Sequence, residues 1–253
     1  MTDGPAFDRP SDVAGAIAGL ARPLLVATDV DGTLSPIAPS PQAARLAPGA
    51  LDALRAVAGR GGVDVAVVSG RSLAELRDQF GLDGVGHLVG SHGAESVHAA
   101  LLDDDERALL DGAVAVLGAI VAATPGARLE RKPMGAALHV RGATPSDAGE
   151  AIDAARAVLG TDPRIQVHEG HAVYEVAVRH VTKAGALAEL RAEFQPAAVV
   201  FLGDDRSDET AFAALGPGDL GVKVGTGPTA ARLRVATPAD VVEVLRLLVA
   251  ALG

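Results

Sequence analysis

Two carboxylates separated by one residue are the sharpest chemical signal in the sequence. Asp29 and Asp31 follow the continuous apolar run 24–28 and lead into Gly32 and Thr33. Residues i and i+2 project to the same side while strand geometry persists, so the two carboxyl groups come close together. Such a pair suits a nucleophile and a proton-transfer partner, with a threonine hydroxyl to bind phosphate oxygens. The alternative is an Asp-x-Asp-Gly turn without a chemical role.

A second group of carboxylates lies in the run 203–209 (Gly-Asp-Asp-Arg-Ser-Asp-Glu), which also follows an apolar stretch. Carboxylate oxygens are the ligands that Mg²⁺ prefers, and several of them partly neutralise the ion before a phosphate group arrives. The alternative is a solvated loop or a helix N-terminus, where acidic side chains suit the helix dipole. Together with Asp29 and Asp31, the run favours a metal site.

Phosphate-binding groups stand between these two acidic motifs. Ser69, Gly70 and Arg71 follow an expected strand at 63–68, and Lys183 lies near an expected helix start. A hydroxyl, backbone amides and the point charge of a lysine can hold a phosphoryl group and offset the charge that develops on it. The alternatives are a helix cap or turn for the serine and an exposed helix residue for the lysine.

The composition limits the classes of protein and of partner. The chain has 253 residues, of which 49% are hydrophobic and only 2% aromatic, so it can bury a sizeable aliphatic core. It contains no Cys, which excludes disulfides, thiolate metal sites and cysteine catalysis. Its formal net charge of −10 argues against nucleic acid or an anionic membrane as a partner. An anionic substrate would therefore need cations gathered locally.

The elements that position these motifs alternate between strand and helix. This alternation predicts an α/β fold with a Rossmann-like, doubly wound parallel sheet and helices on both faces. Each chemical motif comes at the carboxyl end of an expected strand, where ligands bind in such sheets. Strands are expected at 24–28, 63–68, 88–89, 199–202 and 220–224, and helices at 48–61, 72–81, 183–194 and from 238 onward.

The region 99–178 follows a different pattern and predicts an inserted α+β module. A long helical stretch ends near residue 123, and a second helix is expected at 146–159. Four β-like runs accompany them, at 127–131, 136–141, 165–168 and 172–178. The catalytic core would then comprise 1–98 and 179–253. The first 20 residues are expected to form either a tail or a helix packed outside the sheet.

No segment has the features of a membrane anchor. The longest apolar run, 108–123, contains Asp111 and is too short to span a bilayer. The beginning of the chain, Met-Thr-Asp-Gly, lacks the basic and apolar regions of a signal peptide. We therefore expect a soluble cytoplasmic protein without a membrane partner.

The four motifs, in this order and each at a strand end, resemble the haloacid dehalogenase-like phosphatases over the whole chain. The resemblance implies that Asp29 attacks phosphorus to form an aspartyl-phosphate, and that Asp31 protonates the leaving group and later activates water. It implies that Lys183 is catalytic and that phosphate is bound by Thr33, Ser69, Gly70 and Arg71. Mg²⁺ would be held by Asp29, the Asp31 carbonyl and Asp204, with Asp208 as a further ligand or a nearby carboxylate.

Further segments resemble the trehalose-phosphatase family within that superfamily. They are 31–37, 90–95, 130–132, 139–141, 169–170, 174–176 and 203–209. The resemblance implies hydrolysis of trehalose 6-phosphate in trehalose biosynthesis, with the inserted module as a cap that recognises the sugar and hinges near residues 98 and 178. The candidate sugar-binding residues are His92, Glu95, Glu130, Lys132, His139, Arg141, Glu169 and Glu175. The alternative for the charged residues of the module is a set of exposed cross-strand pairs.

Three positions depart from the family pattern. Val140 stands where an aromatic residue is common, Ser207 replaces a threonine, and Ala184 separates Lys183 from Gly185. None of these changes removes a catalytic group. The alternatives in function are a phosphatase for another phosphorylated disaccharide or pseudo-disaccharide, a non-catalytic sugar-phosphate sensor, and a phosphomutase. In each case the expected partner is a small-molecule sugar phosphate, and no protein partner is evident.

Overall fold

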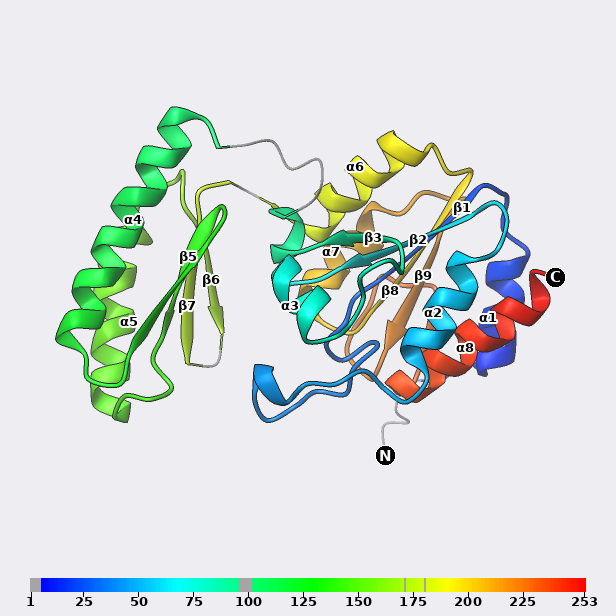
Figure 1. Cartoon of the computed structure of the whole chain (residues 1–253), viewed down its shortest axis with the longest axis horizontal. Coiled ribbons are helices and arrows are strands. Elements are labelled where there is room, and N and C mark those ends of the chain that lie inside the picture. Colours follow the sequence, from blue (N-terminus) through cyan, green and yellow to red (C-terminus); the bar gives the residue numbers. More distant parts are fainter. Residues whose placement is uncertain (1–5, 96–101, 171, 180) are drawn as a thin grey trace. The chain divides into compact units, whose positions relative to one another are not determined.

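The chain forms two compact units, Met1–Val97 with Val181–Gly253 and His98–His180 (Figure 1). The computed structural model describes residues 6–95, 102–170, 172–179 and 181–253. Each unit has its own sheet and its own hydrophobic core.

The first unit is built on a six-stranded sheet in the order β10-β9-β8-β1-β2-β3, in which all neighbouring strands are parallel. The strand order reverses around β1, and ligands bind at such a switch point in open α/β sheets. The prediction of a doubly wound parallel sheet is confirmed. The strands are β1 (Leu24–Thr28), β2 (Val63–Val68), β3 (His87–Val89), β8 (Ala198–Gly203), β9 (Leu220–Val224) and β10 (Leu233–Val235).

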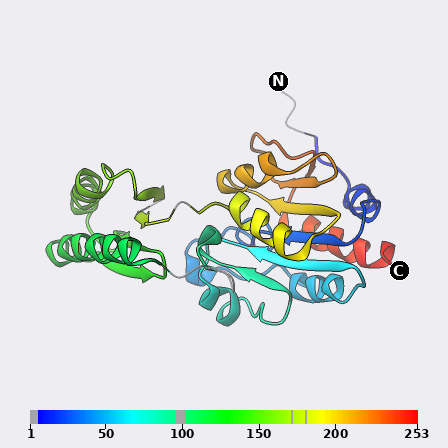
Figure 2. The same ribbon diagram turned by 90° about the horizontal axis from the view of Figure 1, so that it is seen from above.

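Helices cover both faces of this sheet, which explains why its central strands are continuously apolar. Leu24 and Val26 of β1 pack into one core with α1, α2 and α8, whereas Leu25 and Ala27 pack into a second core with α6 and α7. Figure 2 shows these helices around the sheet from a second direction. The helices are α1 (Pro10–Ala18), α2 (Ala50–Ala58), α3 (Leu73–Asp78), α6 (Lys183–Phe194), α7 (Arg206–Ala214) and α8 (Pro238–Ala251), and two 3-10 turns, η1 (Pro41–Ala43) and η2 (Ser91–Gly93), lie in loops.

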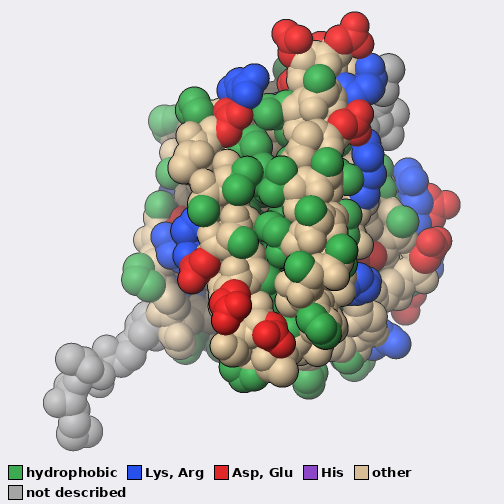
Figure 3. Space-filling model, turned by 90° about the vertical axis from the view of Figure 1, so that its left-hand side faces the viewer, with side chains coloured by type: hydrophobic (Ala, Val, Ile, Leu, Met, Phe, Trp, Pro, Cys, Tyr) green, Lys and Arg blue, Asp and Glu red, His purple; other side chains and the backbone are tan. Residues whose placement is uncertain are grey.

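The inserted unit is a four-stranded antiparallel sheet with two helices on one face. Its strands, in the order β4-β5-β7-β6, place Leu138 and Tyr174 opposite one another. Both side chains are buried together with Leu117 of the first helix. Figure 3 looks onto the two helices, along which hydrophobic side chains gather, with acidic side chains at the N-terminal end of α4. The elements are α4 (Asp104–Ala123), β4 (Arg128–Lys132), β5 (Gly135–His139), α5 (Pro145–Leu159), β6 (Gln166–Gly170) and β7 (Val173–Ala177).

Several helix starts follow directly from capping side chains. Ser72 and Glu75 form a capping box at the start of α3. Thr182 accepts a hydrogen bond from the Gly185 N–H at the start of α6, and Thr237 caps α8. The helices expected from residues 183 and 238 begin at those residues.

Other boundaries differ from the expectation for local reasons. The second helix begins two residues later than expected because Gly49 has a left-handed conformation, with φ of 83°. The strand β10 was not expected from the sequence, since it has only three residues, one of them Arg234. The N-terminal segment forms α1, which packs on α8, so it is a helix outside the sheet rather than a tail. Within the described part of the chain, no helix combines the length and apolar character that crossing a membrane requires.

Candidate active site

Parallel pairing brings three motifs to one edge of the sheet. Thr28 at the end of β1 pairs with Val67 of β2 and with Leu202 of β8. The residues that follow, Asp29 and Ser69 on one side and the acidic run 203–209 on the other, therefore meet at the carboxyl edge. The Asp29 N–H donates to the Leu202 carbonyl at 2.9 Å, which extends the sheet pairing up to the candidate nucleophile.

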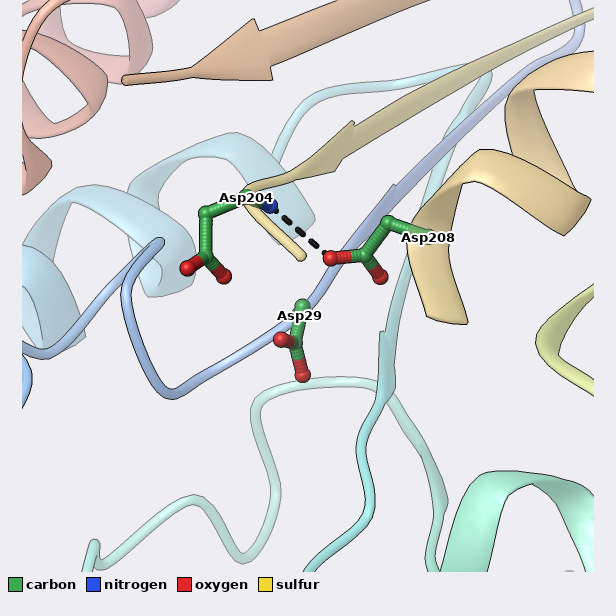
Figure 4. A group of neighbouring side chains, drawn as sticks. All are labelled: Asp29, Asp204 and Asp208. Atoms are coloured by element: carbon green, nitrogen blue, oxygen red, sulfur yellow. Dashed lines mark hydrogen bonds between the residues drawn. The ribbon is translucent and has the colours of Figure 1, made fainter. Parts of the chain in front are cut away.

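Three carboxylates form a cluster at this edge. Asp29, Asp204 and Asp208 each offer an oxygen, and these atoms lie within 4.8 Å of one another (Figure 4). Asp29 and Asp208 are buried. Asp208 comes from α7, and its Oδ2 accepts the N–H groups of Asp204 at 2.8 Å and Asp205 at 3.0 Å. The acidic run is thus both a loop wrapped around Asp208 and the start of a helix.

Lys183 is the positive charge inside this cluster. It is the first residue of α6 and only 2% exposed. Its Nζ lies 3.1 Å from Oδ1 of Asp29 and donates to Oδ1 of Asp208 at 2.6 Å. The alternative of an exposed helix residue is therefore wrong for Lys183.

The pKa values of all three carboxylates in the cluster are raised, because they are withdrawn from water and the cluster holds more negative charge than one lysine can balance. Burial raises the pKa of Asp29, against the effect of Lys183. Burial, and then the charge of Asp29, raise the pKa of Asp204 to about 7 and that of Asp208 to about 7. Burial opposes the charged form of Lys183, but Asp29 and Asp208 outweigh this and raise its pKa. A bound cation would relieve this excess of negative charge.

The donor set and the local backbone fit a metal ion. The three side chains offer hard oxygen ligands of the kind that Mg²⁺ prefers. Glycines let these carboxylates approach the backbone: a Cβ at Gly32, where φ is +82°, would lie 2.0 Å from Oδ2 of Asp204. A Cβ at Gly203 would lie 2.3 Å from Cγ of Asp208. The acidic cluster therefore fits a cation that prefers oxygen ligands.

The two predicted hydroxyl groups are both buried at this edge. Thr33 is fully buried, and its Oγ1 donates to Oδ1 of Asp204 at 3.3 Å. Ser69 is 1% exposed, and its Oγ accepts the Arg71 N–H at 3.3 Å. The serine hydroxyl thus shapes the turn after β2.

Gly70 lies in the same turn, against the His92 ring, where a Cβ would come within 2.7 Å of two ring atoms.

Asp31 lies outside the three-carboxylate cluster and is bound by Arg71. The guanidinium donates from Nε to Oδ2 at 2.7 Å and from Nη2 to Oδ1 at 2.8 Å, a bidentate pair. Arg71 was predicted to bind phosphate, whereas the structure pairs it with the candidate acid–base residue. The structure therefore joins two candidate residues that are far apart in the sequence.

The loop after β3 carries the candidates His92 and Glu95. Ser91 and His92 both have left-handed backbone conformations, with φ of 49° and 58°. One oxygen of Glu95 accepts the Ser91 hydroxyl, and the other accepts the Leu73 N–H at 3.1 Å. These contacts tie the loop to the start of α3, so Glu95 has an internal role here.

Four candidates of the inserted unit share one face of its sheet. Glu130 lies 2.7 Å from His139 (Oε2 to Nε2), and Lys132 donates to Glu175 at 2.7 Å (Nζ to Oε1). The hydrogen bond from His139 lowers the pKa of Glu130. These residues alternate along the strands with Leu129, Leu138 and Tyr174, which face α4 and α5. Pairs between strands are present, as in the alternative interpretation, but they are half-buried rather than exposed, and they gather four polar side chains.

The other two candidates of the inserted unit lie elsewhere. Glu169 pairs in register with Tyr174 and therefore faces the helices. Its two oxygens accept from Arg156 of α5, each at 2.9 Å. Arg141 follows β5 and is exposed. The structure thus does not bring Glu169 together with Glu130 and its neighbours.

Lys223 was not predicted from the sequence, and it holds the acidic loop 203–209 by hydrogen bonds from β9. It is 3% exposed on β9, and its Nζ donates to the Asp204 carbonyl at 2.5 Å and to Oε1 of Glu209 at 3.0 Å. Glu209 in turn accepts the Ala230 N–H at 2.9 Å. The available signal was a lysine within an otherwise apolar five-residue strand.

Comparison with known proteins finds a matching family and relatives that are similar over most of this chain. Residues 27–239 match the protein family described as trehalose-phosphatase. The chain is 34% identical over 233 residues to trehalose-6-phosphate phosphatase of Escherichia coli (strain K12), with 88% of this chain and 86% of that protein covered. It is 33% identical over 249 residues to trehalose-phosphate phosphatase of Mycobacterium bovis (strain BCG / Pasteur 1173P2), with 88% of this chain covered. The match spans 61% of that relative, about three-fifths of its length.

Solved structures extend the likeness to the whole fold. A structure of Aspergillus fumigatus trehalose-6-phosphate phosphatase superimposes with a TM-score of 0.66 at 27% identity, covering 98% of this chain and 99% of that one. A haloacid dehalogenase-like hydrolase from Bacteroides thetaiotaomicron superimposes with a TM-score of 0.64 at 14% identity, covering 88% and 98%. The second likeness shows the fold alone, and that fold is haloacid dehalogenase-like.

Proposed function

Because the chain belongs to the trehalose-phosphatase family, we propose that it hydrolyses trehalose 6-phosphate to trehalose and inorganic phosphate, as a step of trehalose biosynthesis. The observation that carries this proposal is the cluster of the buried Asp29, Asp208 and Lys183 with the partly buried Asp204 at the carboxyl edge of the sheet. Such a cluster can present a carboxylate nucleophile to a phosphate group and balance the charge on both. The reaction class is that of a phosphoric monoester hydrolase.

In the proposed reaction Asp29 is the nucleophile. One of its carboxylate oxygens forms a bond to phosphorus while the bond from phosphorus to the sugar oxygen breaks. Asp31 gives its proton to that sugar oxygen, so trehalose leaves as a neutral alcohol. Asp31 then takes a proton from the water that attacks the aspartyl-phosphate. Phosphate leaves, and the Asp29 carboxylate is restored.

The surrounding residues orient the phosphate and balance its charge. Lys183 holds Asp29 by an ion pair and places an ammonium group beside the reacting oxygens. Ser69 and Thr33 supply hydroxyl groups at the same edge. Mg²⁺, held by Asp29, the Asp31 carbonyl and Asp204, would neutralise charge on the phosphate oxygens. Asp208 supports this site by holding the backbone of the Asp204 loop and by pairing with Lys183.

The sugar is recognised by polar residues of the inserted unit. Glu130, Lys132, His139 and Glu175 together offer several donors and acceptors on one sheet face, as a hydroxyl-rich ligand requires. Arg141 and His92 remain candidates for the same role. Glu95 and Glu169 have weaker support, because their carboxylate oxygens are already used within the protein.

A panel of sugar phosphates tests the proposal. Phosphate release is measured for trehalose 6-phosphate, other phosphorylated disaccharides and monosaccharide phosphates, each with and without Mg²⁺. We expect the highest kcat/KM for trehalose 6-phosphate and no turnover without the ion. A preference of more than about tenfold for another substrate, about 1.4 kcal/mol, would overturn the sugar assignment.

The variant Asp29→Asn is the control for the chemistry. It should stay folded and lose about three or more orders of magnitude in kcat, because the nucleophile is gone. Near-normal turnover in this variant would contradict the covalent route. Binding of trehalose 6-phosphate to the unchanged protein without phosphate release would identify a sensor instead of an enzyme.

A further inference from the structure

The guanidinium of Arg71 already uses most of its hydrogen-bond donors within the protein. Its Nε and one Nη2 hydrogen bind Asp31, while Nη1 donates to Oε1 of Glu75 and to the Pro41 carbonyl, each at 3.0 Å. A guanidinium has five N–H donors, so four of them are used inside the protein. The guanidinium also lies over the Phe80 ring, with Cζ 5.3 Å from the ring centroid. The side chain is only 11% exposed.

Asp31 depends on this contact for a fixed orientation. The chain leaves the sheet directly after Asp29, and a tight turn follows, in which the Gly32 N–H donates to the Ser35 carbonyl at 2.7 Å. The Asp31 side chain is 33% exposed at this turn. Among the side chains that the structure describes, Arg71 supplies both hydrogen bonds recorded for the Asp31 carboxylate. Without them, a carboxylate with this exposure would rotate freely among its staggered conformers.

We propose that Arg71 is a positioning residue for the acid–base carboxylate Asp31, and not a ligand of the substrate phosphate. The inference rests on the proposed function, in which Asp31 transfers protons in both half-reactions. The chain of contacts runs from the start of α3, through Glu75 and Arg71, to Asp31. It holds the carboxylate plane by two hydrogen bonds, one to each oxygen, and the second lone pair of an oxygen stays available for proton exchange, first with the leaving sugar and then with the attacking water.

A double-mutant cycle tests this role. The four proteins are the unchanged chain, Arg71→Met, Asp31→Asn and the double variant, assayed for kcat, KM and inhibition by inorganic phosphate. General acid–base catalysis contributes about 10²–10⁴-fold, so we expect Arg71→Met to lower kcat by about 100-fold. KM and the phosphate inhibition constant should change by less than about threefold. In the Asp31→Asn background, the same substitution should change kcat by less than about threefold.

The alternative role gives a different result. If Arg71 binds phosphate, its loss raises KM and the phosphate inhibition constant and adds to the effect of Asp31→Asn. That outcome would overturn the proposal. Arg71→Lys keeps the charge but cannot form the bidentate pair, so it should recover only part of kcat and serves as the test variant if Arg71→Met does not fold. Full recovery with lysine would also contradict the role of the bidentate geometry.

Arg77→Met is the matched control. Arg77 lies on α3, the helix that begins just after Arg71 and Ser72, is 46% exposed and reaches Asp83 only at 3.8 Å. This variant should retain the kinetics of the unchanged chain, and thermal unfolding of all variants separates loss of stability from loss of positioning. A similar loss of kcat in the control would attribute the effect to α3 as a whole and reject the specific role of Arg71.

The same cycle on p-nitrophenyl phosphate separates this inference from the proposed function. The compound carries no sugar but still requires hydrolysis of the aspartyl-phosphate. If trehalose 6-phosphate is not hydrolysed and the cycle on the aryl phosphate is non-additive, the sugar assignment fails and Arg71 keeps its role. If trehalose 6-phosphate is hydrolysed and the losses are additive on both compounds, Arg71 is not the positioning residue.

Discussion

At the scale of single residues, the site is a balance between three buried or partly buried carboxylates and one buried lysine. Asp29, Asp204 and Asp208 approach one another within 4.8 Å, and Lys183 pairs with two of them. Like charges at this separation favour protonation of the acids. The surplus charge makes metal binding and proton binding two competing ways of stabilising the same side chains.

This competition predicts that binding of Mg²⁺ releases protons near neutral pH. The pKa values of Asp204 and Asp208 are about 7 in the folded protein, against an ordinary value of 3.8. Metal ligands must be deprotonated, so the ion displaces those protons, and its affinity should rise as the pH increases through about 7. Titration calorimetry at pH 6.5 in two buffers of different ionisation enthalpy measures the release. Equal heats in both buffers would contradict it.

The same shifts fix the sign of the pH dependence of stability. An acid with a higher pKa in the folded state takes up a proton on folding, so the metal-free protein loses stability as the pH rises from about 4 to about 7. Urea unfolding at several pH values checks this, and saturating Mg²⁺ should flatten or reverse the trend. The variant Asp204→Asn, which removes one titrating group, should show a shallower dependence.

The sequence predicted a site residue where the residues just before it along the chain formed a recognisable strand. Asp29, Ser69 and Asp204 were predictable because each directly follows an apolar strand, and the ends of parallel strands meet. The partner of Arg71 was not predictable, because Asp31 lies 40 residues away and the pairing depends on how a turn and a helix start are packed.

At the scale of elements, β9 holds the acidic loop in place through Lys223, the one polar residue of an otherwise apolar strand. Lys223 is buried between the Asp204 carbonyl and Glu209, so it fastens β9 to the acidic loop and to α7. The ammonium is neutralised by the carboxylate, and the backbone carbonyl is satisfied by the same group. The strand thereby fixes the backbone of Asp204, although Lys223 does not contact the carboxylate of Asp204.

Loss of this lysine should weaken both stability and metal binding. Lys223→Met removes the cation beside the partly buried Glu209 carboxylate and the side-chain donor to the Asp204 carbonyl, so the free energy of unfolding should fall by about 3 kcal/mol. The double variant Lys223→Met/Glu209→Gln removes both charges and should recover part of the stability but not the Mg²⁺ affinity. Urea unfolding and calorimetry measure the two quantities.

Arg232→Met, an exposed cation in the segment before β10, is the control for the loss of one positive charge. Unchanged affinity for Mg²⁺ in Lys223→Met would show that the contact to the Asp204 carbonyl does not support the metal site.

Element boundaries were predictable where the local signal was nearly unbroken. The expected and observed bounds of β1 and β2 agree because β1 is a continuous apolar run and β2 is a run of valine and alanine interrupted only by Asp64. The start of α2 depends on the left-handed Gly49, and β10 depends on pairing with β9, in which Leu233 lies opposite Val222. Such short strands are set by tertiary packing more than by their own sequence.

At the scale of the whole molecule, the two units divide the chemistry between them. The acidic cluster lies entirely in the first unit, and the polar face with Glu130, Lys132, His139 and Glu175 lies entirely in the second. The sequence predicted an inserted module because its pattern of strands and helices differs from the surrounding alternation. The order of its strands, β4-β5-β7-β6, depends on pairings distant in the sequence and was not predicted.

This division predicts that substitutions in the second unit affect the sugar and not the phosphate. Glu130→Gln and Lys132→Met should raise KM for trehalose 6-phosphate by about tenfold or more, about 1.4 kcal/mol each. Turnover of p-nitrophenyl phosphate, which has no sugar, should stay within about twofold. Steady-state kinetics on the two compounds measure the contrast.

The matched control is Arg131→Met on the same strand. Arg131 is 55% exposed and pairs with Asp111 of α4, on the opposite face from Glu130. It should leave the kinetics with both compounds unchanged. Equal losses on both compounds in Glu130→Gln would show that the inserted unit affects the chemistry and not the sugar alone.

Tyr174, in the core of the inserted unit, makes that unit the source of the tyrosine fluorescence of the protein. The chain has no Trp and a single Tyr, and this tyrosine is fully buried. Ultraviolet emission therefore reports the unfolding of the second unit, whereas circular dichroism reports the helices of both. Comparing the two signals during denaturation shows, without any added label, whether the units melt together or one after the other.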